Sequence, residues 1–114
     1  MSYQAKQGDI IKLDFDPQAG TEQKGRRPAL VVSNSAFHQF TKKGAMVCPI
    51  TNTNKGIPIQ VKLDTRTKTT GVIMCDQAKI LDLSQRSAEF VEEAPKDIVA
   101  EVVDIINSFI EFES

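Results

Sequence analysis

The residue types best suited to chemistry lie in one loop. Residues 20–28 read Gly-Thr-Glu-Gln-Lys-Gly-Arg-Arg-Pro, which brings Glu22 close in sequence to Arg26 and Arg27. A guanidinium is always charged, and its planar fork matches phosphate oxygens, so this loop suits phosphate recognition or phosphoryl chemistry. Pro28 restricts Arg27 to extended backbone where the loop meets an apolar stretch. A solvated, charged hairpin loop is the alternative, because such loops are common on protein surfaces.

Disulfide and metal chemistry find little support in the sequence. Cys48 and Cys75 lie in apolar runs without Cys-x-x-Cys spacing, and His38 is the only histidine. This pattern predicts buried, reduced thiols and argues against a disulfide framework or a structural zinc site. A single histidine also excludes catalysis by a pair of histidines, and we expect His38 to be an ordinary surface side chain on a short helix.

The charge is divided along the chain. Residues 1–88 hold 13 of the 14 Lys and Arg residues against 7 acidic residues, a net charge of +6. Residues 89–114 hold Lys96 alone against 8 acidic residues, a net charge of -7. A basic body can attract nucleic acid through its local field even when the net charge is near zero. An ordinary acidic helix surface explains the second segment equally well.

Length favours a single domain over residues 1–114, since a chain of this size can bury a sizeable core. The first eight residues are polar and lack the apolar stretch of a signal peptide. No run approaches the roughly 20 apolar residues of a membrane span. We therefore expect a cytoplasmic protein.

The elements that must position the loop follow from periodicity. Alternating or continuous apolar runs between turn signals predict strands at residues 9–16, 29–32, 45–50, 57–63, 72–75, 78–83 and 88–91. Pro58 indicates a strand at a sheet edge. The 33–35 segment, Ser-Asn-Ser, can cap a short helix that carries Phe37 and Phe40.

A longer helix is expected after Pro95, which is tolerated in a first helical turn. Apolar residues recur with helical period from Ile98 to Ile110, opposite acidic side chains. The stripe is wider than one contact with a sheet requires, which suggests that part of it is buried against a second copy of the chain. The fold class is thus mostly β, an antiparallel barrel or sheet with a short helix and a C-terminal amphipathic helix.

Short motifs along the chain carry a family resemblance. They are Gly8-Asp9-Ile10, Asp16-Pro17, Gly20-x-Glu22-Gln23-x-Gly25-x-Arg27-Pro28, Pro49-Ile50-Thr51 and Cys75-Asp76-Gln77. In order and spacing they resemble the MazF/PemK (Kid) toxin family over nearly the whole chain. The resemblance implies an SH3-like β barrel that forms homodimers and cleaves single-stranded RNA at short sequences without a metal or other cofactor. It also implies an antitoxin whose acidic segment fills the RNA groove.

The resemblance assigns catalysis to Arg27 and Thr51. Cleavage by the neighbouring 2′-hydroxyl needs a base, an acid for the leaving 5′-oxygen, and positive charge at the phosphorane. Arg27 is expected to stabilise that charge and to help protonate the leaving group, and the Thr51 hydroxyl to hold a phosphate oxygen. Glu22 is the candidate base, although a salt bridge to a neighbouring arginine is its alternative role, as a strand-end cap is for Thr51.

Two departures from the PemK-like pattern favour the MazF-like branch. That pattern has a His where this chain has Thr21, and an Arg where it has Met74. An Arg-Asp mechanism is therefore not available, and Asp76 is expected to bond loop backbone or a base edge instead. The residues expected to contact RNA are Thr21, Gln23, Lys24, Arg26, Asn52, Asn54, Lys55, Asp76 and Gln77.

The sequence is also compatible with two other functions. A non-catalytic SH3-like RNA-binding module would use the same basic loops. A CcdB-like gyrase inhibitor shares the fold the resemblance implies, but that family uses a C-terminal Trp, and this chain has no Trp.

Overall fold

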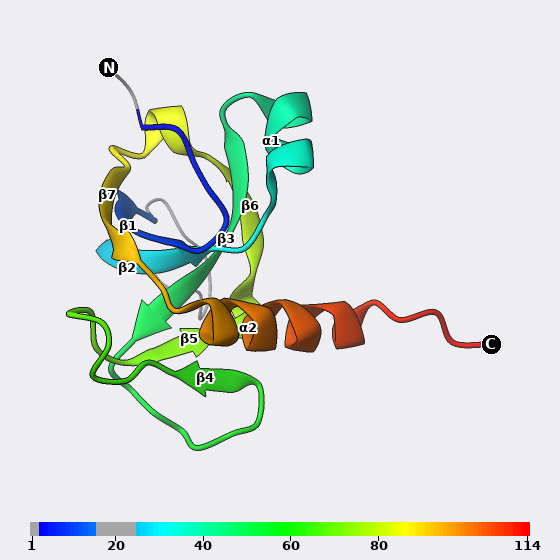
Figure 1. Ribbon diagram of the computed structural model, residues 1–114. Coiled ribbons are helices and arrows are strands. Elements are labelled where there is room, and N and C mark those ends of the chain that lie inside the picture. Colours follow the sequence, from blue (N-terminus) through cyan, green and yellow to red (C-terminus); the bar gives the residue numbers. More distant parts are fainter. Residues whose placement is uncertain (1–2, 16–24) are drawn as a thin grey trace.

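The computed structural model describes residues 3–15 and 25–114, and within these ranges the chain forms one antiparallel seven-stranded sheet (Figure 1). The strands are β1 (Asp9–Asp14), β2 (Arg26–Val31), β3 (Gly44–Thr51), β4 (Gln60–Lys62), β5 (Val72–Met74), β6 (Lys79–Asp82) and β7 (Glu89–Glu93). The order across the sheet is β4-β5-β3-β2-β1-β7, and β6 pairs with β3 beside this path. The two helices are α1 (Ser35–Thr41) and α2 (Lys96–Phe109). Single 3₁₀ turns, η1 (Cys75–Gln77) and η2 (Leu83–Gln85), flank β6.

Each predicted strand has a counterpart, but several are shorter than predicted. The strand expected at 57–63 shrinks to β4, because Pro58 and Ile59 form a turn and proline cannot donate to a ladder. The first strand ends at Asp14, and residue 16, where its end was expected, lies outside the described residues. Cys75 belongs to η1 rather than to β5.

The sheet is open. In the described part of the chain, β4 pairs only with β5, and β7 pairs only with β1. The closed barrel that the family resemblance implies is therefore not confirmed, whereas the antiparallel sheet that the residues alone allowed is present. Side chains rather than strand pairing bridge the two edges, since Glu92 of β7 accepts hydrogen bonds from the backbone of Lys68 and Thr69 between β4 and β5.

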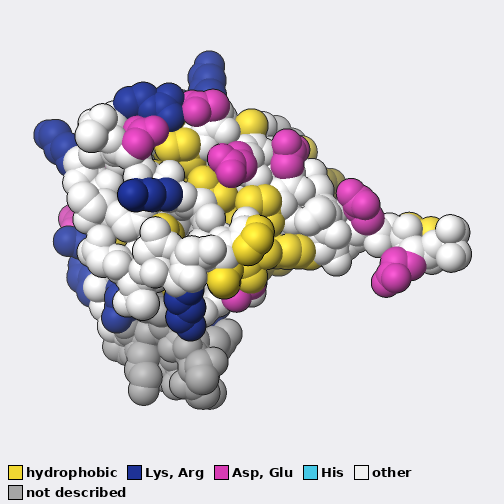
Figure 2. Space-filling model, turned by 90° about the horizontal axis from the view of Figure 1, so that it is seen from below, with side chains coloured by type: hydrophobic (Ala, Val, Ile, Leu, Met, Phe, Trp, Pro, Cys, Tyr) yellow, Lys and Arg dark blue, Asp and Glu magenta, His cyan; other side chains and the backbone are white. Residues whose placement is uncertain are grey.

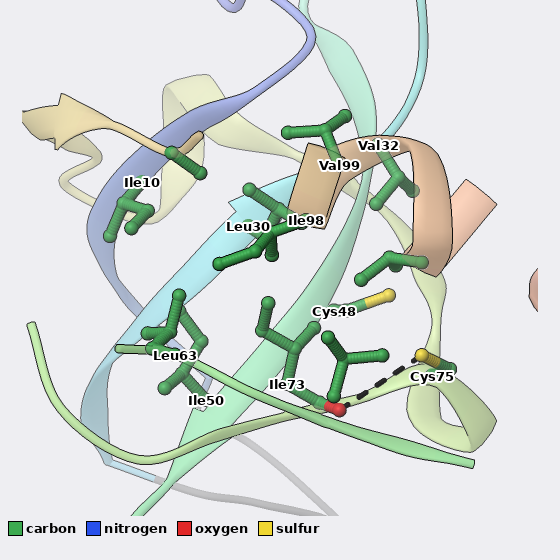
Figure 3. Packing of buried hydrophobic residues seen from close by; sticks show 13 residues of the cluster. Ile10, Leu30, Val32, Cys48, Ile50, Leu63, Ile73, Cys75, Ile98 and Val99 are labelled. Carbon is green, nitrogen blue, oxygen red and sulfur yellow. Dashed lines mark hydrogen bonds between the residues drawn. The ribbon is translucent and has the colours of Figure 1, made fainter. Parts of the chain in front are cut away.

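Two hydrophobic clusters cover the two faces of the sheet. Successive side chains of a strand point to opposite faces, so Leu30 and Val31 of β2 belong to different clusters. The first cluster packs under α2 and contains Ile10, Leu30, Val32, Cys48, Ile50, Val61, Leu63, Ile73, Cys75, Ala94, Ile98, Val99 and Val102 (Figure 3). The second contains Ile11, Leu13, Phe15, Ala29, Val31, Ala45, Val47, Leu81 and Leu83. The continuous apolar run 29–32 thus marks a central strand buried on both sides, as predicted.

Both cysteines are buried and free, as predicted. Burial raises the pKa of Cys75 to about 11 and also raises that of Cys48, so both stay protonated at neutral pH. They serve as small apolar side chains of the first cluster.

The short helix α1 begins as predicted. The Asn34 side chain accepts a hydrogen bond from the Phe37 backbone N–H at 3.1 Å and caps the helix. His38 is half-buried instead of lying free on the surface, because its Nε2 is 2.7 Å from the Ser33 hydroxyl. That hydroxyl also accepts a hydrogen bond from the Met46 N–H at 2.8 Å. His38 therefore ties α1 to the start of β3.

The C-terminal helix α2 follows Pro95 and buries Ile98, Val99 and Val102 on the first cluster. Its last turns extend beyond the sheet (Figure 1), and Ile110, just after its end, is 77% exposed. Among the described residues, no helix has the length and apolar character needed to cross a membrane.

Candidate active site

Arg27, near the start of β2, and Thr51, at the end of β3, lie at the same end of the sheet. β2 pairs with β3 through Ala29 and Pro49, and extending this register by two residues places Arg27 opposite Thr51. Opposite residues of an antiparallel pair project on the same face, so both side chains lie on the face of the second cluster, beyond its last apolar residues. Pro28 has no N–H to continue the ladder, which explains why the pairing of β2 with β3 stops beside these two residues.

Thr51 is held firmly in place. It is 8% exposed, and its Oγ1 accepts a hydrogen bond from the Thr53 N–H at 3.2 Å. This is the strand-end turn that the sequence left open as its alternative role. The two roles are compatible, because the hydroxyl uses a lone pair in the turn and keeps its proton to donate to an anion.

Arg26 and Arg27 face opposite sides of β2, as neighbours on a strand must. The Arg26 guanidinium lies 2.9 Å from Glu89 of β7 and 3.4 Å from Asp14 of β1. The hydrogen bonds that it donates, chiefly to Glu89 and also to Asp14, raise the pKa of Arg26. Arg27 is half-buried on the other face, opposite Leu13 of β1. The predicted RNA contact through Arg26 would thus compete with two carboxylates.

The sequence did not predict a second cation on the same face of the sheet as Arg27. Lys79 of β6 pairs with Val47 of β3, so its side chain lies on the face of the second cluster. Its Nζ sits 5.9 Å from the centre of the Phe15 ring, a cation–π contact at the end of β1. The sequence held a signal for this position. Lys79 and Leu81 alternate with Ile80, so Lys79 shares the face of the buried Leu81, whereas Ile80 faces outward.

The loop after Thr51 carries the exposed residues expected to meet RNA. Asn52 accepts a hydrogen bond from the Thr70 hydroxyl at 2.9 Å. Asn54 accepts one from the Gly56 N–H at 2.7 Å, and the Lys55 N–H donates to Gln60 at 3.0 Å. These bonds shape the loop while the Lys55 side chain stays on the surface.

Asp76 and Gln77 occupy η1, which contacts β3. Asp76 is exposed, and Gln77 is half-buried. The Gln77 Oε1 atom is buried and has no hydrogen-bond partner among the described residues. Met74, which stands in place of the PemK-like Arg, is 5% exposed and fills a core position in β5.

The remaining predicted site residues, Thr21, Glu22, Gln23 and Lys24, lie outside the described residues. In the described ranges, no group of three or more His, Cys, Asp or Glu side chains is placed to hold a metal ion.

Comparison with known proteins gives a family match over most of the chain. Residues 6–110 match the family described as PemK-like, MazF-like toxin of type II toxin-antitoxin system. The chain is 34% identical to endoribonuclease PemK of Escherichia coli over 109 residues, which cover 92% of this chain and 81% of PemK.

Solved structures agree in fold. The chain superposes on MazF from Deinococcus radiodurans with a TM-score of 0.88 and 40% identity, covering 96% of this chain and 98% of that one. A MazE-MazF structure from the same organism gives a TM-score of 0.82 and 40% identity over 96% and 97% of the two chains. The family match spans β1 to α2 and includes both Arg27 and Thr51. The chain therefore belongs to the PemK-like, MazF-like family of type II toxin-antitoxin toxins.

Proposed function

We propose that this protein is an endoribonuclease toxin that cleaves single-stranded RNA, mRNA in particular, at a short sequence in the cytoplasm. The observation that carries the proposal is the pairing of Ala29 with Pro49, because the same register continued by two residues would set Arg27 across from Thr51 at the end of the sheet. A half-buried guanidinium and a nearly buried hydroxyl on one face suit a phosphate group. Two relatives from Escherichia coli, endoribonuclease PemK and endoribonuclease toxin MazF, support the same activity.

The reaction we propose is transfer to the neighbouring 2′-oxygen. A base removes the 2′-hydroxyl proton, a bond forms between this oxygen and phosphorus, and the bond to the 5′-oxygen breaks as that oxygen gains a proton. The products are a 2′,3′-cyclic phosphate and a 5′-hydroxyl. Arg27 stabilises the charge of the phosphorane and supports protonation of the leaving oxygen, and Thr51 donates to a phosphate oxygen. Glu22 is the candidate base.

The positive charge in this mechanism comes from side chains, so we propose that cleavage needs no metal ion. Lys79 adds charge on the same face as Arg27. Asn52, Asn54 and Lys55 follow Thr51 in the chain, and we propose that they supply contacts to RNA bases or backbone together with Asp76 and Gln77. Bases splayed out of a single strand offer their edges to such groups.

The test is digestion of a mixed transcript by the purified protein in EDTA, with mapping of the 5′ ends. Cleavage at a recurrent short sequence, leaving 5′-hydroxyl ends, is the expected result. Activity that appears only after addition of Mg²⁺ or Zn²⁺ would overturn the metal-independent mechanism. Binding of RNA without cleavage under any condition would favour the non-catalytic module.

We also propose an acidic antitoxin as partner and a homodimer as the working form. The MazE-MazF structure supports the first proposal by analogy. A carboxylate-rich segment can pair with the guanidinium that holds phosphate, so it would compete with RNA for the same groove. An acidic peptide that binds without displacing RNA would contradict the shared groove.

A further inference from the structure

We infer that Glu92 is a positioning residue for Thr51 and Asn52, acting through the turn formed by residues 64–71. This inference rests on the proposed function, because it concerns how the cleavage site is held in place. Glu92 lies on β7, at the opposite edge of the sheet from β4 and β5, and belongs to none of the groups expected to touch RNA. Its effect would therefore be carried by the turn alone.

Glu92 holds the turn through both oxygens of its carboxylate. Its Oε1 accepts a hydrogen bond from the Lys68 N–H at 3.0 Å. Its Oε2 accepts from the Thr69 N–H at 2.8 Å and from the Thr69 hydroxyl at 2.7 Å. Hydrogen bonds to a charged carboxylate are stronger than neutral ones, and the half-buried setting limits competition from water.

The residues directly after Thr69 touch the candidate site. The Thr70 hydroxyl donates to the Asn52 side chain at 2.9 Å. Gly71 lies against the backbone of Thr51 so closely that a Cβ atom there would come within 2.4 Å of the Thr51 carbonyl oxygen. Gly71 also has a φ of +117°, which allows the turn to enter β5 at this point. Movement of the turn would thus be transmitted to Thr51 and Asn52 at once.

The segment between these contacts is short and internally braced. Thr67 is only 8% exposed, and its hydroxyl donates to the Thr69 carbonyl at 2.7 Å. The Leu63 N–H donates to the Gly71 carbonyl at 3.0 Å and closes the base of the turn. The Glu92 anchor at Thr69 is directly next to Thr70 and two residues from Gly71, so we expect it to set their place more strongly than a contact farther along the turn does.

A second anchor on the same turn offers a matched control. Arg66 bonds Asp64 within the turn, and it bonds Asp97 of α2 at 2.8 and 3.0 Å. These groups are exposed, and in the described part of the chain the Arg66 side chain donates its hydrogen bonds to Asp64 and Asp97 and not to Thr69 or Thr70. Loss of the Arg66 contacts removes a charged anchor of similar kind without touching Thr69 or Thr70.

The experiment compares steady-state cleavage by the full-length protein and its variants on one short RNA. Glu92→Ala should lower kcat by about 10-fold or more with a smaller change in KM, because small displacements of groups at the reacting phosphate are costly. Glu92→Gln, which keeps one acceptor oxygen, should fall between Glu92→Ala and wild type. Arg66→Gln should keep the wild-type kcat even if its melting temperature falls as much as that of Glu92→Ala.

Amide hydrogen exchange gives a readout that needs no activity. The Thr53 N–H, which bonds Thr51 Oγ1, should exchange faster in Glu92→Ala than in wild type or Arg66→Gln. If the wild-type protein cleaves no RNA, the proposed function is wrong. The exchange rate at Thr53 then still tests whether Glu92 positions Thr51. A folded Glu92→Ala with wild-type kcat and wild-type exchange at Thr53 would overturn the inference, as would equal losses of kcat in Glu92→Ala and Arg66→Gln.

Discussion

Two adjacent arginines show that residue type alone does not assign a role. Arg26 and Arg27 occupy one strand and face opposite sides. Arg26 forms ion pairs with Asp14 of β1 and Glu89 of β7. Arg27 projects on the face where β3 ends in Thr51. Register thus separates an arginine that joins strands from one that can meet phosphate.

Arg27→Ala should therefore lower cleavage by about 10²-fold or more, the usual scale for loss of one electrostatic donor at a reacting group. Arg26→Ala should have a smaller effect on kcat, because it removes exposed ion pairs with Glu89 and Asp14. Single-turnover cleavage at saturating protein separates chemistry from RNA affinity. Equal single-turnover rates for wild type and Arg27→Ala would remove Arg27 from the chemistry.

The central pair of the candidate site, Arg27 and Thr51, stays a prediction, and the sequence did not predict all of its surroundings. Arg27 and Thr51 were predicted through the family motifs, and the register of the sheet supports their proximity. Lys79 was missed because its relation to Phe15 depends on the pairing of β6 with β3, which local sequence does not specify. Local sequence also does not specify the contact of His38 with the Ser33 hydroxyl, which in turn accepts a hydrogen bond from the Met46 N–H.

At the scale of elements, apolar periodicity predicted where strands and helices occur, because burial on one or two faces dictates it. The connections between elements were less predictable. The bond between Glu92 and Thr69 joins residues 23 apart in sequence, and no local pattern signals it. Pro58 correctly indicated a strand at the edge of the sheet. The turn at residues 58–59, however, makes β4 shorter than the strand predicted at 57–63 from alternating apolar residues. Tertiary contacts of single side chains decided these details.

Two glycines allow a test of how closely the turn approaches β3. Gly71→Ala should lower the free energy of unfolding by about 2 kcal/mol or more, since it combines positive φ with a clash against the Thr51 backbone. Gly56→Ala is the control, because Gly56 has a φ of +66° but a methyl group added there would meet no atom within 4 Å. It should cost about 1 kcal/mol. Urea unfolding measures both, and equal losses would show that the turn does not press on Thr51.

The Glu92 anchor should also appear in the pH dependence of stability. Burial raises the pKa of Glu92, but hydrogen bonds from Lys68 and Thr69 outweigh it and hold the pKa below its ordinary value of 4.5. A group with a lowered folded pKa contributes stability above the unfolded value, and this contribution is lost as pH falls through the folded pKa. Wild type should therefore lose more unfolding free energy below about pH 4.5 than Glu92→Gln does. Identical acid slopes in urea titrations would contradict this assignment.

At the scale of the whole molecule, the acidic segment 89–114 is partly a counterpart to the basic body. Glu89 pairs with Arg26, Asp97 pairs with Arg66, and Glu92 holds the turn between β4 and β5. Contacts between the acidic segment and the basic body thus help to hold β7 and α2 against the rest of the molecule. The alternatives raised from the sequence, a nucleic-acid field or an ordinary acidic surface, are not exclusive of this use.

The apolar surface beside α2 supports the proposed homodimer. Met46, Ile105 and Ile106 are only partly buried against the first cluster, and Ile80, which is opposite Met46 in the β3–β6 pair, is 55% exposed. Figure 2 shows hydrophobic side chains gathered where α2 leaves the sheet. A contiguous apolar surface of this kind is typical of a contact between copies, and a two-fold axis would use it on both.

Ile80→Asp should therefore shift the protein from dimer to monomer at micromolar concentration, because a charge in the centre of an apolar interface would lose its hydration without gaining a partner. Phe90→Asp is the matched control, since Phe90 is 52% exposed but lies opposite Ile11 of the second cluster, and so on the face of the sheet that α2 does not cover. Light scattering over a range of concentrations measures the association, and circular dichroism checks that both variants fold. A wild-type monomer at micromolar concentration would contradict the homodimer, and a dimeric Ile80→Asp would place the interface on another surface.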